Sequence, residues 1–200
     1  MSDDYFKTLE GPSQEEFKDR GSRFMAFAFP IADAPEFKTE LNRLKKLHPK
    51  AAHHCFAYRL GTLGHNFRAV DDGEPSGSAG RPILGQIDSL GITNAAVVVV
   101  RYFGGTLLGV PGLIHAYKTA AAWALQTAPV GLKAIELPYA IECNYAQLNE
   151  VMTVLKAANC SIANIEQGLF CHLRCGLPKS HASHVLHKLS CLSGVGAVPA

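Results

Sequence analysis

Residues 94–112 read Asn-Ala-Ala-Val-Val-Val-Val-Arg-Tyr-Phe-Gly-Gly-Thr-Leu-Leu-Gly-Val-Pro-Gly. The unbroken β-branched run from Val97 to Val100 is typical of a central strand that is covered on both faces, so we predict a strand over 94–103. The glycine-rich half that follows leads into a predicted helix over 113–128, because apolar residues recur there at helical spacing. The apolar stripe of that helix consists of Leu113, Tyr117, Ala120, Ala121, Ala124 and Leu125.

The sequence before this strand predicts a run of alternating strands and helices. The expected elements are a strand over 22–30, a helix capped by Asp33, a strand over 53–60, its hairpin partner over 67–70 and a helix over 82–90. The helix after Asp33 has one apolar side, made of Phe37, Leu41, Leu44 and Leu47. The segment 71–81 is rich in Gly, Ser, Asp and Pro and is therefore predicted to be a loop.

Pro129 and Gly131 end the long helix and predict a domain boundary, which divides the chain into residues 1–130 and residues 131–200. The second part predicts the order β-α-β-β-α, the order of a ferredoxin-like split βαβ domain. Its expected elements are strands over 132–142, 160–166 and 169–176, helices over 145–158 and 181–189, and a short fourth strand within 194–199. The expected fold class is α+β.

Composition restricts the class of protein. A hydrophobic fraction of 48% and a charged fraction of 18% are ordinary for a globular protein. A net charge of +2 is too small to predict a general affinity for polyanions. The N-terminus lacks a secretory signal, and the longest apolar run is far shorter than the roughly 20 residues that span a bilayer. We therefore expect a cytoplasmic protein without a membrane partner, whose six cysteines are reduced.

An acidic loop is the first candidate for chemistry. Asp71, Asp72 and Glu74 place three carboxylates within four residues. They could hold a hard cation such as Mg²⁺ beside a phosphate. Alternatively, Asp72 and Glu74 accept loop N–H groups, cap the next helix and pair with Arg81 or Arg101, and we favour this second interpretation.

The end of the central strand is the second candidate. Arg101 follows an apolar run, so its guanidinium must reach an acceptor, and we expect a carboxylate of the acidic loop. The glycines from Gly104 to Gly112 suggest a cradle for an anion, or they allow positive φ and close chain packing. Tyr102 and Phe103 could stack on exposed bases, although residues of a central strand are more often core.

The histidines and cysteines give weaker signals. His53 and His54 point to opposite faces of one strand, so they cannot easily share a metal ion, and we expect one in the core and one at the surface. The spacing of His181, His184 and His187 differs from the usual zinc motifs. We therefore expect no metal and no cofactor. No catalytic triad or nucleophile elbow is recognisable either.

Three segments, residues 52–59, 71–84 and 99–117, together resemble the signature of the YigZ/IMPACT family, and the resemblance extends over essentially the whole chain. It implies an N-terminal domain with the βαβ fold of the second domain of a small-subunit ribosomal protein. It also implies a ferredoxin-like domain similar to the last domain of elongation factor G. Three departures are visible: Ser78 in place of Thr, Val110-Pro111 in place of a small pair, and Lys118 in place of a small residue.

The resemblance also bears on function. Eukaryotic relatives regulate translation by competing for the activator of the amino-acid-starvation kinase, whereas two-domain members have no settled activity. We expect a translation-linked protein that binds ribosomal RNA or a ribosome-associated protein, rather than an enzyme. The alternatives are a Mg²⁺-dependent enzyme acting on phosphates or nucleotides, and a regulator that binds only proteins. The predicted binding residues are His54, Asp71, Asp72, Glu74, Ser76, Ser78, Arg81, Arg101, Tyr102, Phe103, Gly104, Gly105, Gly109 and Gly112.

Overall fold

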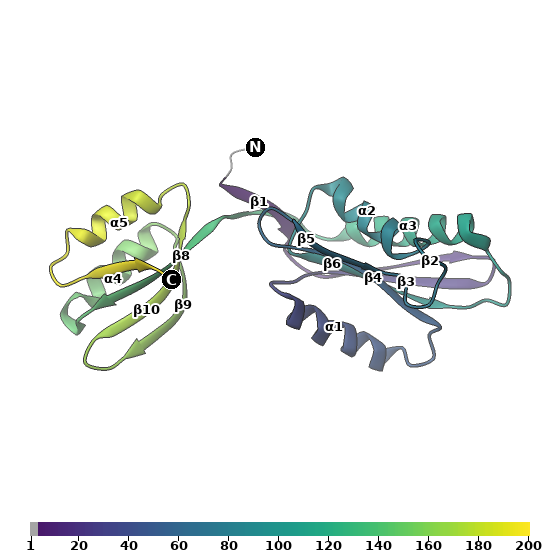
Figure 1. The fold of residues 1–200 in the computed structure, drawn as a ribbon, viewed down its shortest axis with the longest axis horizontal. Coiled ribbons are helices and arrows are strands. Elements are labelled where there is room, and N and C mark those ends of the chain that lie inside the picture. Colours follow the sequence, from purple (N-terminus) through teal and green to yellow (C-terminus); the bar gives the residue numbers. More distant parts are fainter. Residues whose placement is uncertain (1–3) are drawn as a thin grey trace. The chain divides into compact units, whose positions relative to one another are not determined.

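The computed structural model describes residues 4–200 and shows an α+β protein. The chain divides into two compact units, one formed by Phe6–Lys133 and one formed by Ala134–Ala200 together with Asp4 and Tyr5. The larger unit contains the first seven strands and the first three helices (Figure 1). No helix within residues 4–200 is both long enough and apolar enough to cross a membrane.

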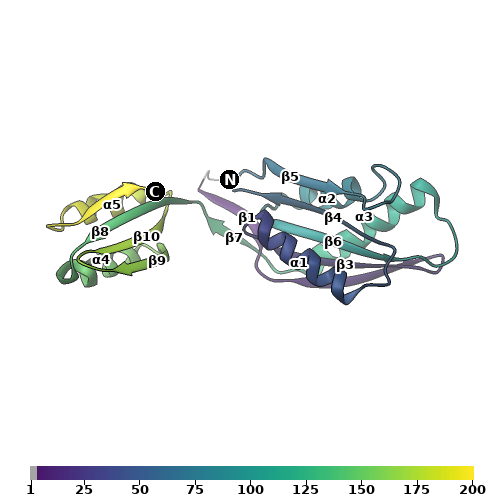
Figure 2. The same ribbon diagram turned by 60° about the horizontal axis from the view of Figure 1, so that its bottom comes forward.

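The larger unit is built around a five-stranded sheet. Its elements are β1 (Tyr5–Leu9), β2 (Ser13–Asp19), β3 (Ser22–Pro30), α1 (Ala34–Leu47), β4 (His53–Leu60), β5 (Asn66–Val70), α2 (Gly80–Leu90), β6 (Ala95–Tyr102), α3 (Gly109–Thr127) and β7 (Val130–Ala134). The sheet has the order β2-β3-β6-β4-β5 with antiparallel neighbours, and β1 pairs separately with β7. Helix α1 covers one face of the sheet, and α2 and α3 cover the other (Figures 1 and 2).

The central position of β6 confirms the prediction made from its valines. Val97 and Val99 are fully buried against α2 and α3, and Val98 and Val100 are fully buried on the side of α1. Because side chains alternate along a strand, a continuous apolar run fills both cores at once. β6 therefore brings Arg101, at its end, between the loops that precede α2 and α3.

Four details differ from the sequence predictions. Strands β1 and β2 were not predicted: β1 has only five residues, and the sequence of β2, Ser-Gln-Glu-Glu-Phe-Lys-Asp, is that of a polar edge strand. Helix α2 begins at Gly80 rather than at residue 82. Helix α3 begins at Gly109, whose φ is 69°, so Gly112 is helical, and Pro111 lies in the first turn, where its missing N–H costs little. Leu47 is 59% exposed rather than part of the core, since α1 ends there.

The smaller unit has the strand order of a ferredoxin-like domain. Its elements are β8 (Glu136–Cys143), α4 (Tyr145–Ala157), β9 (Ser161–Gln167), β10 (Cys171–Pro178), α5 (Ala182–Ser190) and β11 (Gly196–Pro199), and its sheet order is β11-β8-β10-β9. The predicted single strand over 132–142 was wrong. At Ile135 the partners change, because its N–H donates to the carbonyl of Asp4 and its carbonyl accepts from the N–H of Lys179.

Candidate functional site

Asp71 follows β5 and caps helix α2. Its carboxylate accepts hydrogen bonds from the backbone N–H groups of Gly77, Ala79 and Gly80 at 2.9, 3.0 and 2.8 Å. Burial raises the pKa of this carboxyl, but the three N–H donors lower it, and the pKa is lowered overall. The carboxylate oxygens of Asp71 thus both accept hydrogen bonds from the loop and from the start of α2.

Asp72 links the same loop to the start of β4 by hydrogen bonds. Its carboxylate accepts the backbone N–H of His54 at 2.7 Å, and its carbonyl lies 2.8 Å from Nδ1 of His53. Asp72 has φ of 44°, in the left-handed region that Asp tolerates better than most residues. This left-handed backbone conformation of Asp72 allows both its carboxylate and its carbonyl to contact β4.

Glu74 is buried and meets the end of β6. Its Oε1 accepts from Nη1 of Arg101 at 2.6 Å and from the hydroxyl of Tyr117 at 2.7 Å. Nε2 of His53 lies 3.9 Å from the same oxygen. The predicted pairing of Arg101 with the acidic loop is confirmed, and Glu74 supplies the carboxylate.

The favoured interpretation is thus confirmed for the pairing of Glu74 with Arg101. It was wrong about the helix cap and the loop N–H groups, because Asp71 accepts them, while Asp72 accepts an N–H group of β4. Within residues 4–200, no group of three His, Cys, Asp or Glu side chains is placed to hold a metal ion. The carboxylates organise the loop and neutralise Arg101.

The Arg101 side chain is almost completely enclosed. It is 6% exposed, and its Nε is buried without an acceptor among residues 4–200. The rings of Phe24 and Phe103 lie 5.4 and 5.6 Å from its Cζ. A buried donor without a partner costs about 1–3 kcal/mol, so Arg101 is not optimised for stability alone.

Tyr117 and Cys55 belong to the same buried network and both contact residues of the acidic loop. The Sγ of Cys55 lies 2.9 Å from the carbonyl of Asp71 and 3.3 Å from the hydroxyl of Tyr117. Burial raises the pKa values of both Cys55 and Tyr117 far above their usual ranges. Both groups therefore stay protonated, which fits a structural role and not that of a nucleophile.

The two histidines lie as predicted, one buried and one partly exposed. His54 is buried on the side of α1, where burial lowers its pKa, and its Nε2 has no partner among the described residues. His53 is partly exposed on the side of Glu74. Tyr102 is half-buried on the same side as His54, and its hydroxyl lies 2.9 Å from Nδ1 of His48.

Gly104 allows two chain segments to touch. A Cβ at this position would lie 1.9 Å from the carbonyl carbon of Gly21, and the N–H of Gly104 donates to Oγ of Ser22 at 3.1 Å. Gly105 has φ of 85° and open space around it. Close chain packing explains Gly104 and positive φ explains Gly105, so these two glycines need no bound anion to account for them.

An exposed, uncharged segment follows Arg101. Between Tyr102 and His115 the sequence has no charged residue. Four large apolar side chains are exposed here: Phe103 by 52%, Leu107 by 81%, Val110 by 45% and Ile114 by 38%. We call this part of the chain the 103–114 segment. Four exposed large apolar side chains within these twelve residues make the segment a candidate contact site for another molecule.

The remaining predicted residues lie around the acidic loop. Ser76 and Arg81 are exposed. Ser78 is buried, and its hydroxyl donates to the carbonyl of Pro75 at 2.6 Å. The sequence did not identify Tyr117, Cys55 or Ser22 as members of the network, since a tyrosine in an apolar helix stripe and a cysteine in a strand both indicate core.

These features define a two-domain α+β protein with an internally neutralised acidic loop beside an exposed apolar segment. A family model described as the Impact N-terminal domain matches residues 20–125. The chain is 34% identical over 171 residues to the IMPACT family member YigZ of Escherichia coli K12, covering 84% of each protein. The chain belongs to the IMPACT family.

Two further similarities extend this comparison. The Protein IMPACT homolog of Saccharomyces cerevisiae is 36% identical over 108 residues, which cover 51% of this chain and 41% of that protein. A crystal structure described as that of a hypothetical protein superimposes with a TM-score of 0.80 at 29% identity, covering 98% of both chains. The second comparison supports the fold along the whole chain.

Proposed function

We propose that this protein is a translation-linked binding protein whose N-terminal domain contacts ribosomal RNA or a ribosome-associated protein. The domains are taken as residues 1–130 and residues 131–200, and the ferredoxin-like domain supplies a second contact. The link to translation comes from the family, whose eukaryotic relatives are implied to regulate translation. The protein acts in the cytoplasm in this proposal.

One observation carries the choice of a binding protein over an enzyme. The three carboxylates of the acidic loop are bonded to backbone N–H groups and to Arg101, whereas the neighbouring 103–114 segment exposes four large apolar side chains. A catalytic cation would need those carboxylates free, but a partner needs only the exposed surface. The Mg²⁺-dependent enzyme is therefore not proposed.

Sedimentation in sucrose gradients tests the proposal. Wild type should co-migrate with ribosomal particles, and Leu107→Asp should shift toward the top of the gradient, because a charge replaces an exposed apolar contact. The matched control is Leu63→Asp, which changes the same residue type at 73% exposure in the same unit and should leave co-migration intact.

Salt concentration separates the two kinds of partner. Contacts to RNA phosphates weaken steeply as salt rises, whereas apolar contacts to a protein do not. Co-migration that survives high salt would indicate a protein partner, and co-migration lost at high salt would indicate RNA. Wild type at the top of the gradient at low and high salt would contradict the proposal.

A further inference from the structure

Arg101 has more hydrogen-bond donors than its surroundings use. An arginine carries five N–H donors in a planar fork. Within residues 4–200, the guanidinium donates one hydrogen bond, from Nη1 to Glu74, and Nε is buried without an acceptor. Nε thus needs an acceptor that this part of the chain does not supply.

The neighbours of Arg101 hold the guanidinium in place without accepting a hydrogen bond from Nε. Glu74 is itself held by the hydroxyl of Tyr117, so the ion pair has a defined position. The rings of Phe24 and Phe103 both lie within 5.6 Å of Cζ, and aromatic rings pack against a guanidinium without accepting conventional hydrogen bonds from it. The guanidinium is therefore held in one orientation before any ligand binds.

Phe103 is the one of these two rings that reaches solvent. Phe24 is fully buried, whereas Phe103 is 52% exposed. The backbone after Phe103 is fixed, because Gly104 is packed against Gly21 and bonded to Ser22. Rotation of an exposed side chain takes only picoseconds to nanoseconds, so the ring can turn outward while the backbone stays in place.

We propose that Arg101 binds one oxyanion of the partner, a carboxylate or a phosphate, which enters when the ring of Phe103 turns outward. The fork of an arginine matches the paired oxygens of both groups. Glu74 is a positioning residue in this arrangement, because its ion pair with Arg101 fixes the guanidinium. The inference rests on the proposed function, because it names the chemical group by which the partner of this surface is recognised.

An NMR titration of the arginine Nε–H signals tests this proposal. The full-length protein is labelled with ¹⁵N-arginine, and the signal of Arg101 is identified by its loss in Arg101→Lys. Sodium phosphate, sodium acetate and sodium chloride are added separately at constant ionic strength. We expect a saturable shift of the Arg101 signal with phosphate, acetate or both, and none with chloride.

Two comparisons make the titration specific. Phe103→Ala removes the covering ring and should raise the affinity several-fold, and Phe103→Leu serves the same purpose if the alanine variant does not fold. Arg174, an exposed arginine of the ferredoxin-like unit, should show only a weak shift that does not saturate. Saturation with phosphate alone or acetate alone assigns that group as the ligand.

The proposal is overturned if the Arg101 signal does not saturate with either anion in wild type and in the Phe103 variant, or if Arg174 responds equally. This result is distinct from failure of the proposed function. A negative titration with intact co-migration removes only the oxyanion site. A positive titration without co-migration removes the link to translation and retains the site.

Discussion

Arg101 and Glu74 form the most buried ion pair of the described residues, with 2.6 Å between Nη1 and Oε1 and side chains that are 6% and 4% exposed. The pair joins the end of β6 to the acidic loop before α2, across 27 residues of sequence. It neutralises a charge that the apolar sheet would otherwise enclose. The ion pair therefore forms because the central strand β6 ends in a buried arginine that needs a carboxylate partner.

Replacing Glu74 by glutamine should destabilise the larger unit strongly. Removing one partner of a buried ion pair costs about 3–5 kcal/mol, because the remaining charge is left without compensation. Tyr117 would also lose its charged acceptor. Urea denaturation followed by the single tryptophan, Trp123 on α3, reports on this unit.

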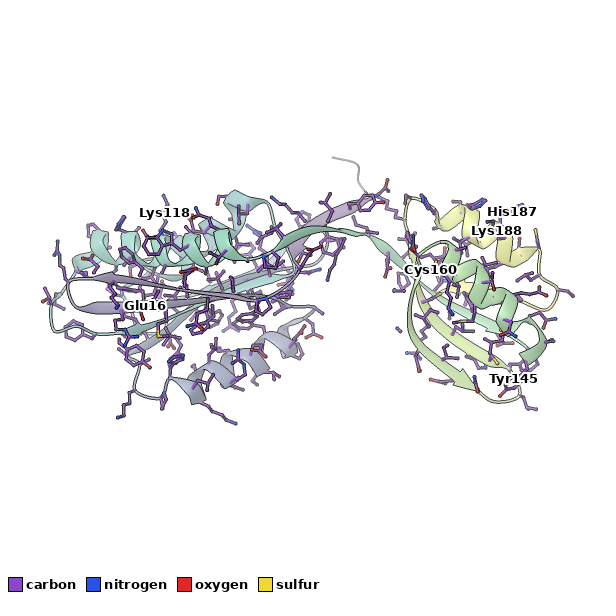
Figure 3. All side chains as sticks on the ribbon, turned by 180° about the vertical axis from the view of Figure 1, so that it is seen from behind. Glu16, Lys118, Tyr145, Cys160, His187 and Lys188 are labelled. Carbon is purple, nitrogen blue, oxygen red and sulfur yellow. The ribbon has the colours of Figure 1, made fainter. Side chains whose placement is uncertain are left out.

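The control for this change is Glu16→Gln. Glu16 of β2, labelled in Figure 3, also lies 2.6 Å from Arg23 of β3, but this pair is at the exposed surface. Solvent and salt screen such pairs, so we expect a much smaller loss of stability. Equal losses for Glu74→Gln and Glu16→Gln would show that burial does not govern the Arg101 pair.

Gly104→Ala should be more damaging than Gly105→Ala. A methyl group on Gly104 would meet the backbone of Gly21 and Ser22, which cannot move as a flexible side chain can, and we expect a loss of about 3 kcal/mol. At Gly105 space is open, so only the positive φ is strained, at about 1 kcal/mol.

Gly85→Ala is the control for these two variants, because it makes the same change at a glycine within a helix. Gly85 lies in α2 with no atom close to an added Cβ, so alanine should stabilise the protein by up to about 1 kcal/mol. The free energy of unfolding should thus be highest for Gly85→Ala, intermediate for Gly105→Ala and lowest for Gly104→Ala. Any other order would contradict the close contact between Gly104 and Gly21.

The sequence predicted the pairing of Arg101 because a charge at the end of an apolar strand must find an acceptor. It could not identify Glu74 as that acceptor, since three carboxylates within four residues differ only in the direction that the loop gives them. The loop direction depends on Asp72, whose left-handed backbone and bond to His54 are tertiary features. The exposure of Phe103 likewise depends on where the sheet ends.

The fold was easier to predict where burial leaves a pattern. Val97 to Val100 predicted the central strand, and the apolar stripe with Tyr117 predicted α3. Polar β2 left no such pattern, because its outer edge faces solvent. The start of α3 was missed because Gly109 and Pro111 usually indicate a loop, although proline is also compatible with a first helical turn.

Asp71→Asn should destabilise α2 in a pH-dependent manner. Asparagine places an NH₂ group where one carboxylate oxygen accepts a backbone N–H, so we expect a loss of about 1–2 kcal/mol at pH 7. The pKa of Asp71 is lowered in the fold, so its contribution is present above the unfolded value of about 3.9 and is lost as the pH falls through the folded value.

The stability difference between wild type and Asp71→Asn should therefore shrink below about pH 4, as measured by urea denaturation at several pH values. Asp33→Asn is the control, because Asn and Asp cap helices about equally well and Asp33 caps α1 on the exposed surface. A difference for Asp71→Asn that stays constant from pH 7 to pH 3 would argue against a charged cap.

The six cysteines should differ sharply in their reaction with a thiol reagent. Cys191 is exposed, Cys160 is partly exposed, and Cys55, Cys143, Cys171 and Cys175 are buried. Burial, with smaller contributions from Cys175 and Glu136, raises the pKa of Cys160 to about 11. At pH 8 only about one in a thousand Cys160 side chains is then a thiolate, the reactive form.

With Ellman's reagent at pH 8, native protein should release one equivalent rapidly from Cys191 and react much more slowly at Cys160. Cys191→Ser should abolish the rapid phase, and all six thiols should react in denaturant, which verifies that they are reduced. Raising the pH toward 10 should accelerate the slow phase, because the thiolate fraction of Cys160 rises about tenfold per pH unit. A rapid phase that persists in Cys191→Ser would show that a second thiol is more accessible than the fold places it.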